Sequence, residues 1–142
     1  MATARDRSLI RQAERYAIEH SDDLDNRVGV VIEAATGEMA CGANRIPSPY
    51  KYDERRTRPG KYPWMVHAEI DAIMAFARKG VDISGATVYM QWFPCSACAA
   101  ALCAGRIARI VCSRPDYGAD RYHFGKAEQL LRENGIVIDF TD

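Results

Sequence analysis

Two short segments carry the side chains with the clearest chemical potential. His67-Ala68-Glu69 is followed downstream by Pro94-Cys95-Ser96-Ala97-Cys98. One imidazole and two thiolates are ligands that zinc prefers, and catalytic zinc sites have three protein ligands and an open fourth position. Glu69 would then be an uncommitted carboxylate that handles protons for a zinc-activated water. Together the two segments predict hydrolytic chemistry at a zinc ion.

The cysteine pair fits several roles when it is considered alone. Cys95 and Cys98 are three residues apart at the predicted start of a helix, so their side chains share a face. The N–H groups and dipole of that first turn favour thiolates. A redox pair, a structural zinc site and a catalytic zinc site all use this spacing. His67 and Glu69 upstream favour the catalytic zinc site, with His67, Cys95 and Cys98 as its ligands.

His67 and Glu69 are only two residues apart, which constrains the helix that carries them. On a regular helix their side chains would point to nearly opposite sides. Both can reach one site only if His67 lies at the very start of the helix, which the approach through Pro63 allows. Considered separately, His67 could be an ordinary loop histidine and Glu69 a solvated acid in the first turn of a helix.

The elements that must position these residues follow from periodicity and turn signals. Helices are predicted over residues 8–20, 67–79, 95–104 and 124–134, and strands over 27–34, 38–43, 86–91, 107–113 and 136–140. This order predicts an α/β protein with three α-β-α layers: a mixed five-stranded sheet with helices on both faces and its later strands parallel. Ligands of such sheets bind near helix N-termini, where both metal segments lie.

Residues 44–66 form a predicted long loop that contains four prolines and four aromatic residues. Loops of this length inside a compact domain are often functional. Between residues 45 and 61 it holds six positive and two negative side chains. They could clamp a phosphate or simply be solvated. Arg58 and Lys61, the nearest to His67 in sequence, are the candidates for a phosphate site.

The chain as a whole has 142 residues, a hydrophobic fraction of 48% and no formal net charge. We expect a single domain over residues 1–142. Zero net charge disfavours a polynucleotide substrate. Five cysteines without an N-terminal apolar stretch disfavour a disulfide-bonded secreted protein, and no run is long enough for a membrane span. A cytoplasmic location is therefore predicted.

From residue 44 to 112 the chain resembles the zinc-dependent cytidine/deoxycytidylate deaminase superfamily, and within it the dCMP deaminases. The matching strings are CGANRIP (41–47), VHAEIDAIMAFARKG (66–80), SGATVYMQWFPCSACA (84–99) and AGRIARIVC (104–112). The signature of a histidine and glutamate followed by Pro-Cys-x-x-Cys is that of zinc nucleobase deaminases. The resemblance to the dCMP branch depends mainly on Trp92-Phe93 and on the Gly-Ala-Asn opening.

This resemblance implies a cytidine-deaminase-like fold, Zn²⁺ as cofactor, a small nucleotide or nucleoside substrate and a homo-oligomer. It also implies roles for individual residues: His67, Cys95 and Cys98 as zinc ligands, Glu69 as proton shuttle, Asn44 near the pyrimidine and sugar, the backbone of Ala68 at the base edge, and Trp92 as a pocket wall. The expected reaction is hydrolytic deamination of dCMP to dUMP and ammonia.

One departure and several alternatives stay open. Many dCMP-type deaminases have asparagine where this chain has Asp71. The extra negative charge could disfavour a phosphorylated substrate, or the side chain could face away from the pocket. The substrate could instead be a free nucleoside or a base such as cytosine or guanine. The zero net charge of the chain disfavours editing of RNA or DNA. The competing non-enzymatic hypothesis is an inactive, zinc-stabilised interaction module.

Overall fold

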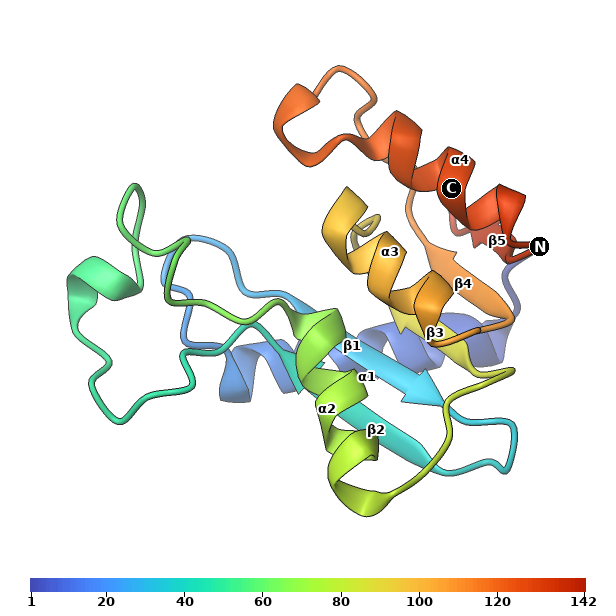
Figure 1. Cartoon of the computed structure of the whole chain (residues 1–142), viewed down its shortest axis with the longest axis horizontal. Coiled ribbons are helices and arrows are strands. Elements are labelled where there is room, and N and C mark those ends of the chain that lie inside the picture. The colour runs from blue at the N-terminus through green and yellow to red at the C-terminus, as the bar shows by residue number, and fades with distance from the viewer.

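The protein is built on one mixed five-stranded sheet. This computed structural model describes residues 1–142, with the side chain of residue 120 left aside. The strand order is β2-β1-β3-β4-β5 (Figure 1), and the strands are β1 (Gly29–Glu33), β2 (Met39–Ala43), β3 (Thr87–Met90), β4 (Arg109–Cys112) and β5 (Val137–Phe140). β1 is antiparallel to β2 and β3, whereas β3, β4 and β5 are parallel. The predicted mixed sheet with parallel later strands is confirmed.

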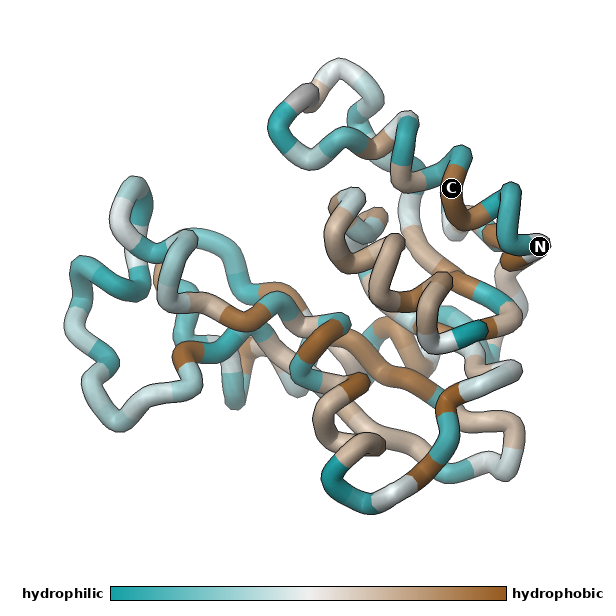
Figure 2. The backbone as a smooth tube through the Cα atoms, in the orientation of Figure 1, coloured by the Kyte–Doolittle hydropathy of each residue, from teal (hydrophilic) through white to brown (hydrophobic). Residues whose placement is uncertain are grey.

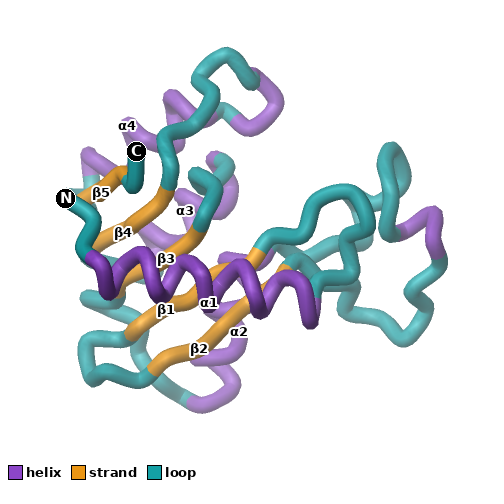
Figure 3. The backbone as a smooth tube through the Cα atoms, turned by 180° about the vertical axis from the view of Figure 1, so that it is seen from behind, coloured by secondary structure: helices purple, strands orange, loops and turns teal.

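Helices cover both faces of this sheet. α1 (Ala4–His20) packs on β1, β2 and β3 and lies alone on one face, in front of the sheet in Figure 3. α2 (Ala68–Lys79), α3 (Ser96–Ala104) and α4 (Phe124–Glu133) lie on the opposite face (Figure 1). The three-layer α-β-α architecture is therefore confirmed. No helix within the described part of the chain is long and apolar enough to cross a membrane.

The core is split by the sheet into two apolar layers. Val30 and Ile32 of β1 belong to the larger cluster beneath α2, α3 and α4, while Val31 between them packs with Leu9 and Tyr89 on the α1 side. This is the alternation that a strand buried on both faces requires. Figure 2 shows the hydrophobic stretch along β1 at the centre of the fold.

α1 begins earlier than predicted, at Ala4 rather than residue 8. Thr3 and Asp6 form a capping box, in which each side chain accepts from the backbone N–H of the other. This arrangement satisfies two N–H groups that would otherwise lack partners at the helix start. Asp6 is also paired with Arg109 of β4 at 2.7 Å, which ties α1 to the sheet.

Two irregular segments flank the sheet at its functional end. The predicted loop over residues 44–66 is confirmed, and its one helical turn is a 3₁₀ segment, η1 (Asp53–Arg55). A second short 3₁₀ segment, η2 (Asp120–Tyr122), lies between β4 and α4. Both segments project beyond the helical layer in Figure 1. They contribute walls to the pocket described below.

Candidate active site

The two predicted metal segments meet because two helices begin beside each other. His67 is the N-cap residue of α2, and Cys95 is the N-cap residue of α3, both with extended backbone. Cys98 lies in the first turn of α3 and is buried. The expectation that His67 stands at the very start of its helix is confirmed. Ahead of α2, the chain is free of helical constraint, so the imidazole can turn toward α3.

The three potential ligand atoms have the spacing that zinc requires. Nδ1 of His67 lies 3.6 Å from Sγ of Cys95 and 3.3 Å from Sγ of Cys98. All three atoms lie within 4.8 Å of one another. A tetrahedral ion with Zn–S near 2.3 Å and Zn–N near 2.0–2.1 Å separates nitrogen from sulfur by about 3.6 Å. The side chains therefore fit a zinc ion, with Nδ1 as the nitrogen ligand.

The electrostatics of the thiol pair favour a bound cation. A hydrogen bond with Cys98 lowers the pKa of Cys95 to about 4. The same hydrogen bond raises the pKa of Cys98, and a hydrogen bond with Cys95 raises the pKa of His67. Cys95 is thus a thiolate at neutral pH, which is the form that binds metal.

Glu69 is set apart from these ligands although it shares their pocket. Among the described residues, the group with metal-ligand spacing comprises His67, Cys95 and Cys98, without Glu69. Only 4% of Glu69 is exposed, and this burial raises the pKa of its carboxyl group. A raised pKa suits a group that must both accept and release a proton near neutral pH.

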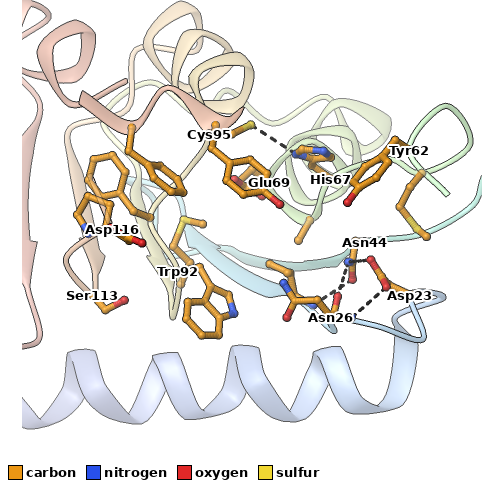
Figure 4. Close-up of a pocket in the computed structure, with 18 of the residues that line it drawn as sticks. Asp23, Asn26, Asn44, Tyr62, His67, Glu69, Trp92, Cys95, Ser113 and Asp116 are labelled. Atoms are coloured by element: carbon orange, nitrogen blue, oxygen red, sulfur yellow. Dashed lines mark hydrogen bonds between the residues drawn. The ribbon is translucent and has the colours of Figure 1, made fainter. Parts of the chain in front are cut away.

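A pocket of about 470 Å³ opens in front of these groups. His67, Glu69 and Cys95 line one wall in Figure 4, and Trp92 and Asn26 lie across from them. Binding pockets for small molecules commonly span about 300–1,000 Å³. The cavity is therefore of a size for one nucleotide. All of the predicted site residues line it except the buried Cys98: Asn44, His67, Ala68, Glu69, Trp92 and Cys95.

Asn44 lines the pocket, but its side-chain amide already makes all of its hydrogen bonds with other groups of the protein. Its Oδ1 accepts from Ser21 Oγ and from the Val28 N–H at 3.0 Å. Its Nδ2 donates to Asp23 Oδ2 at 3.1 Å and to the Asn26 carbonyl at 2.8 Å. Only 6% of Asn44 is exposed. Its predicted contact with substrate stays a prediction.

Asp71 faces the sheet and does not line the pocket. Its Oδ2 accepts from the backbone N–H of Ala43 and from Nε of Arg45, each at 3.0 Å. Arg45 also donates to the hydroxyl of Tyr16. The negative charge of Asp71 is therefore paired, and it has no direct path to a phosphate in the pocket.

The six basic side chains of the loop over residues 44–66 fall into two groups, those held within the protein and those that line the pocket. Arg45, Lys51 and Arg56 are engaged with other parts of the protein, and Arg55 packs on Trp64 of the same loop. Of the six loop cations, only Arg58 and Lys61 line the pocket. Lys61 is buried and paired with Asp23 at 2.7 Å. Nε of Arg58 donates to the hydroxyl of Tyr62 at 2.9 Å, and the guanidinium forms no ion pair with a described side chain.

Several pocket residues were not predicted from the sequence: Asp23, Asn26, Tyr62, Ser113, Arg114, Asp116, Tyr122 and Phe124. Ser113 to Asp116 directly follow β4, so the rule that ligands bind beyond the carboxyl ends of parallel strands could have found them. Asp23 and Asn26 lie in a polar turn whose importance only its tertiary contacts reveal.

Gly42 of β2 sets how closely α2 approaches the sheet. A Cβ atom at this position would lie 2.2 Å from the carbonyl oxygen of Ala68 and 2.5 Å from the nitrogen of Ala72. Only glycine allows this contact between a strand and the first turn of the helix. The contact fixes the end of α2 that carries His67 and Glu69.

Comparisons with known proteins agree with this geometry. The family model described as the cytidine and deoxycytidylate deaminase zinc-binding region matches residues 3–114. The deoxycytidylate deaminase of Pongo abelii is 28% identical over 113 residues, which are 74% of this chain and 60% of that protein. The deoxycytidylate deaminase of Enterobacteria phage T2 is 35% identical over 74 residues, 51% of this chain and 37% of that protein.

The fold is also found among solved structures. The crystal structure of dCMP deaminase from the cyanophage S-TIM5 in complex with dCMP and dUMP matches with a TM-score of 0.79 and 18% identity, covering 99% of both chains. At that identity the likeness shows a shared fold. This chain spans about 60% of the length of the mammalian relative it matches.

Proposed function

This chain belongs to the family of cytidine and deoxycytidylate deaminases that share a zinc-binding region, and from that premise we propose that it hydrolyses dCMP to dUMP and ammonia. One observation carries the proposal. A buried carboxylate, Glu69, shares a nucleotide-sized pocket with three convergent zinc ligands and is not one of them. The inactive-module hypothesis does not account for this placement, because a purely structural zinc site needs no buried acid beside it.

His67, Cys95 and Cys98 would hold the metal, since their donor atoms have tetrahedral spacing. The zinc ion, when bound, supplies Lewis acidity that lowers the pKa of a water molecule from 15.7 toward about 7. The protein contributes the rest of the chemistry. His67 and Cys95 stand at the N-termini of α2 and α3, which hold these two side chains in place beside the pocket.

Glu69 would move the protons of the reaction. Its carboxylate accepts a proton from the attacking water and delivers it to N3 of the cytosine ring. Once oxygen is bound to C4, the carboxylate takes the second proton from that oxygen and passes it to the departing amine as the C4–N4 bond breaks. Water and the cytosine amine thus become a C4 carbonyl and ammonia. Burial of Glu69 supports this role, because it raises the pKa of the carboxyl group and so favours the protonated form that donates.

The remainder of the pocket would orient the nucleotide. The backbone of Ala68, buried at the start of α2, would meet the edge of the base, and Trp92 would supply an aromatic wall; both residues line the pocket. We assign the phosphate to Arg58 rather than to Lys61. Arg58 is exposed in the pocket, whereas the ammonium of Lys61 is already neutralised by Asp23. Arginine binds phosphate through paired N–H groups.

A substrate panel tests the proposal. The zinc-loaded protein would be assayed for ammonia release from dCMP, deoxycytidine, cytidine, cytosine and guanine. We expect the highest kcat/KM for dCMP. Faster turnover of a compound without phosphate would contradict the monophosphate assignment, and release from none of them would favour the inactive module.

A further inference from the structure

Asn26 presents a free amide to the pocket from a backbone that is held on both sides. Its N–H donates to Asp23 Oδ1 at 3.0 Å, and its carbonyl accepts from Asn44 Nδ2 at 2.8 Å. The side chain is exposed and lines the pocket. Within the described part of the chain, no group hydrogen-bonds with its side-chain amide. Figure 4 places Asn26 beside Asn44, on the side of Trp92.

Asn44, by contrast, has nothing left to offer a ligand. An asparagine amide has two donors and two acceptor positions, and Ser21, Val28, Asp23 and Asn26 fill all four. The partners also fix the orientation of the amide, because Val28 N–H can only donate and the Asn26 carbonyl can only accept. Turning Asn44 toward a ligand would break buried hydrogen bonds.

The surroundings make Asn44 a rigid support for Asn26. Asp23, which bonds both asparagines, is itself buried and paired with Lys61 at 2.7 Å. No buried polar side-chain atom lacks a partner among the described residues. A fully satisfied buried network of this kind holds its members in one arrangement. The backbone of Asn26 is therefore held in place, and its side-chain amide extends into the pocket from that fixed point.

We propose that Asn26 reads the sugar hydroxyl of the nucleotide and that Asn44 acts only through it, as a positioning residue. This inference deepens the proposed function, on which it rests. A primary amide can donate to and accept from a hydroxyl at once. In a deoxynucleotide the sole sugar hydroxyl is at the 3′ carbon. Asn26 would thus contact the 3′-hydroxyl while the base occupies the zinc side of the pocket.

The test compares dCMP with 2′,3′-dideoxy-CMP in the zinc-loaded wild type, Asn26→Ala, Asn44→Ala and the double variant. We expect the wild type to prefer dCMP in kcat/KM by roughly 3- to 10-fold, the worth of one neutral hydrogen bond. Asn26→Ala should bring this ratio to about one by raising KM for dCMP, with kcat and the melting temperature unchanged. The control Gln129→Ala removes an amide from α4, away from the pocket, and should keep the preference.

Asn44→Ala should lower the melting temperature and also remove the preference, and the double variant should lose no further discrimination. If Asn26→Ala retains the preference, or if the double variant loses more discrimination than Asn26→Ala alone, the proposal is overturned and Asn44 reads the sugar directly. If the wild type prefers deoxycytidine to dCMP, the monophosphate assignment fails, and deoxycytidine with 2′,3′-dideoxycytidine replaces the pair in the same test. Turnover of free bases only, or of no compound, overturns the inference as well.

Discussion

Replacing Lys61 with methionine should destabilise the protein strongly, because its ammonium group neutralises a buried carboxylate. Nζ of Lys61 donates to Oδ1 and Oδ2 of Asp23 at 2.9 and 2.7 Å, and each side chain is only 5% exposed. Removing one member of a buried ion pair leaves the other charge uncompensated and costs about 3–5 kcal/mol. Asp23 keeps hydrogen bonds from Asn44 and backbone N–H groups, so we expect the lower half of that range.

The measurement is urea denaturation of the zinc-loaded protein at pH 7, followed by circular dichroism. The matched control is Arg5→Met, which breaks an ion pair with Glu33 at the same 2.7 Å but with 58% of the arginine side chain exposed. This control should change the free energy of unfolding far less than Lys61→Met, because water screens surface pairs.

A double variant separates the charge from the packing of the lysine. Asp23→Asn combined with Lys61→Met should be more stable than Lys61→Met alone, since no buried charge is left unpaired. The reasoning would be refuted by a loss below about 1 kcal/mol in Lys61→Met, or by a double variant at least as unstable as the single one.

Three further outcomes follow from the same structure. The hydrogen bond with an arginine on β4 lowers the pKa of Asp6 from 3.8 to about 2. The advantage of wild type over Asp6→Asn in unfolding free energy, about 2 kcal/mol, should therefore be complete above about pH 5 and should be lost as the pH falls through about 2 in acid titrations. Gly42→Ala should weaken zinc binding roughly 10- to 100-fold by displacing Ala68 and the start of α2. Competition with a chromophoric chelator measures the zinc affinity. The control Gly125→Ala, at a position with open space for a Cβ atom, should leave the zinc affinity unchanged. Arg58→Ala should raise KM roughly tenfold for dCMP but not for deoxycytidine in steady-state kinetics; an equal rise for both would reject the phosphate contact.

The fold was predictable from the sequence because its elements follow simple periodic rules. β1 alternates between two cores, and α2 and α3 end at Gly80 and Gly105. The earlier start of α1 was missed although Thr3 and Asp6 have the spacing of a capping box. That signal is local and was available in the sequence.

The chemical centre was predictable for a different reason. His67, Cys95 and Cys98 are brought together by two helix starts at one edge of the sheet, and sequence spacing already restricts that geometry. Part of the pocket lining was not predictable, because the positions of Asn26 and Lys61 depend on partners far along the chain. A count of loop charges cannot distinguish a lysine paired in the interior from an arginine open to a ligand. The single-domain, homo-oligomeric and cytoplasmic assignments stay predictions.

The role of Glu69 is tested most directly by measuring zinc content and turnover together in Glu69→Gln. If the carboxylate handles protons without binding the metal, the variant should retain one zinc per chain, as wild type does, and lose roughly 10²- to 10⁴-fold or more in kcat for dCMP. Loss of the zinc would instead make Glu69 a ligand. Turnover at the wild-type rate would leave its buried carboxyl group without a part in the reaction.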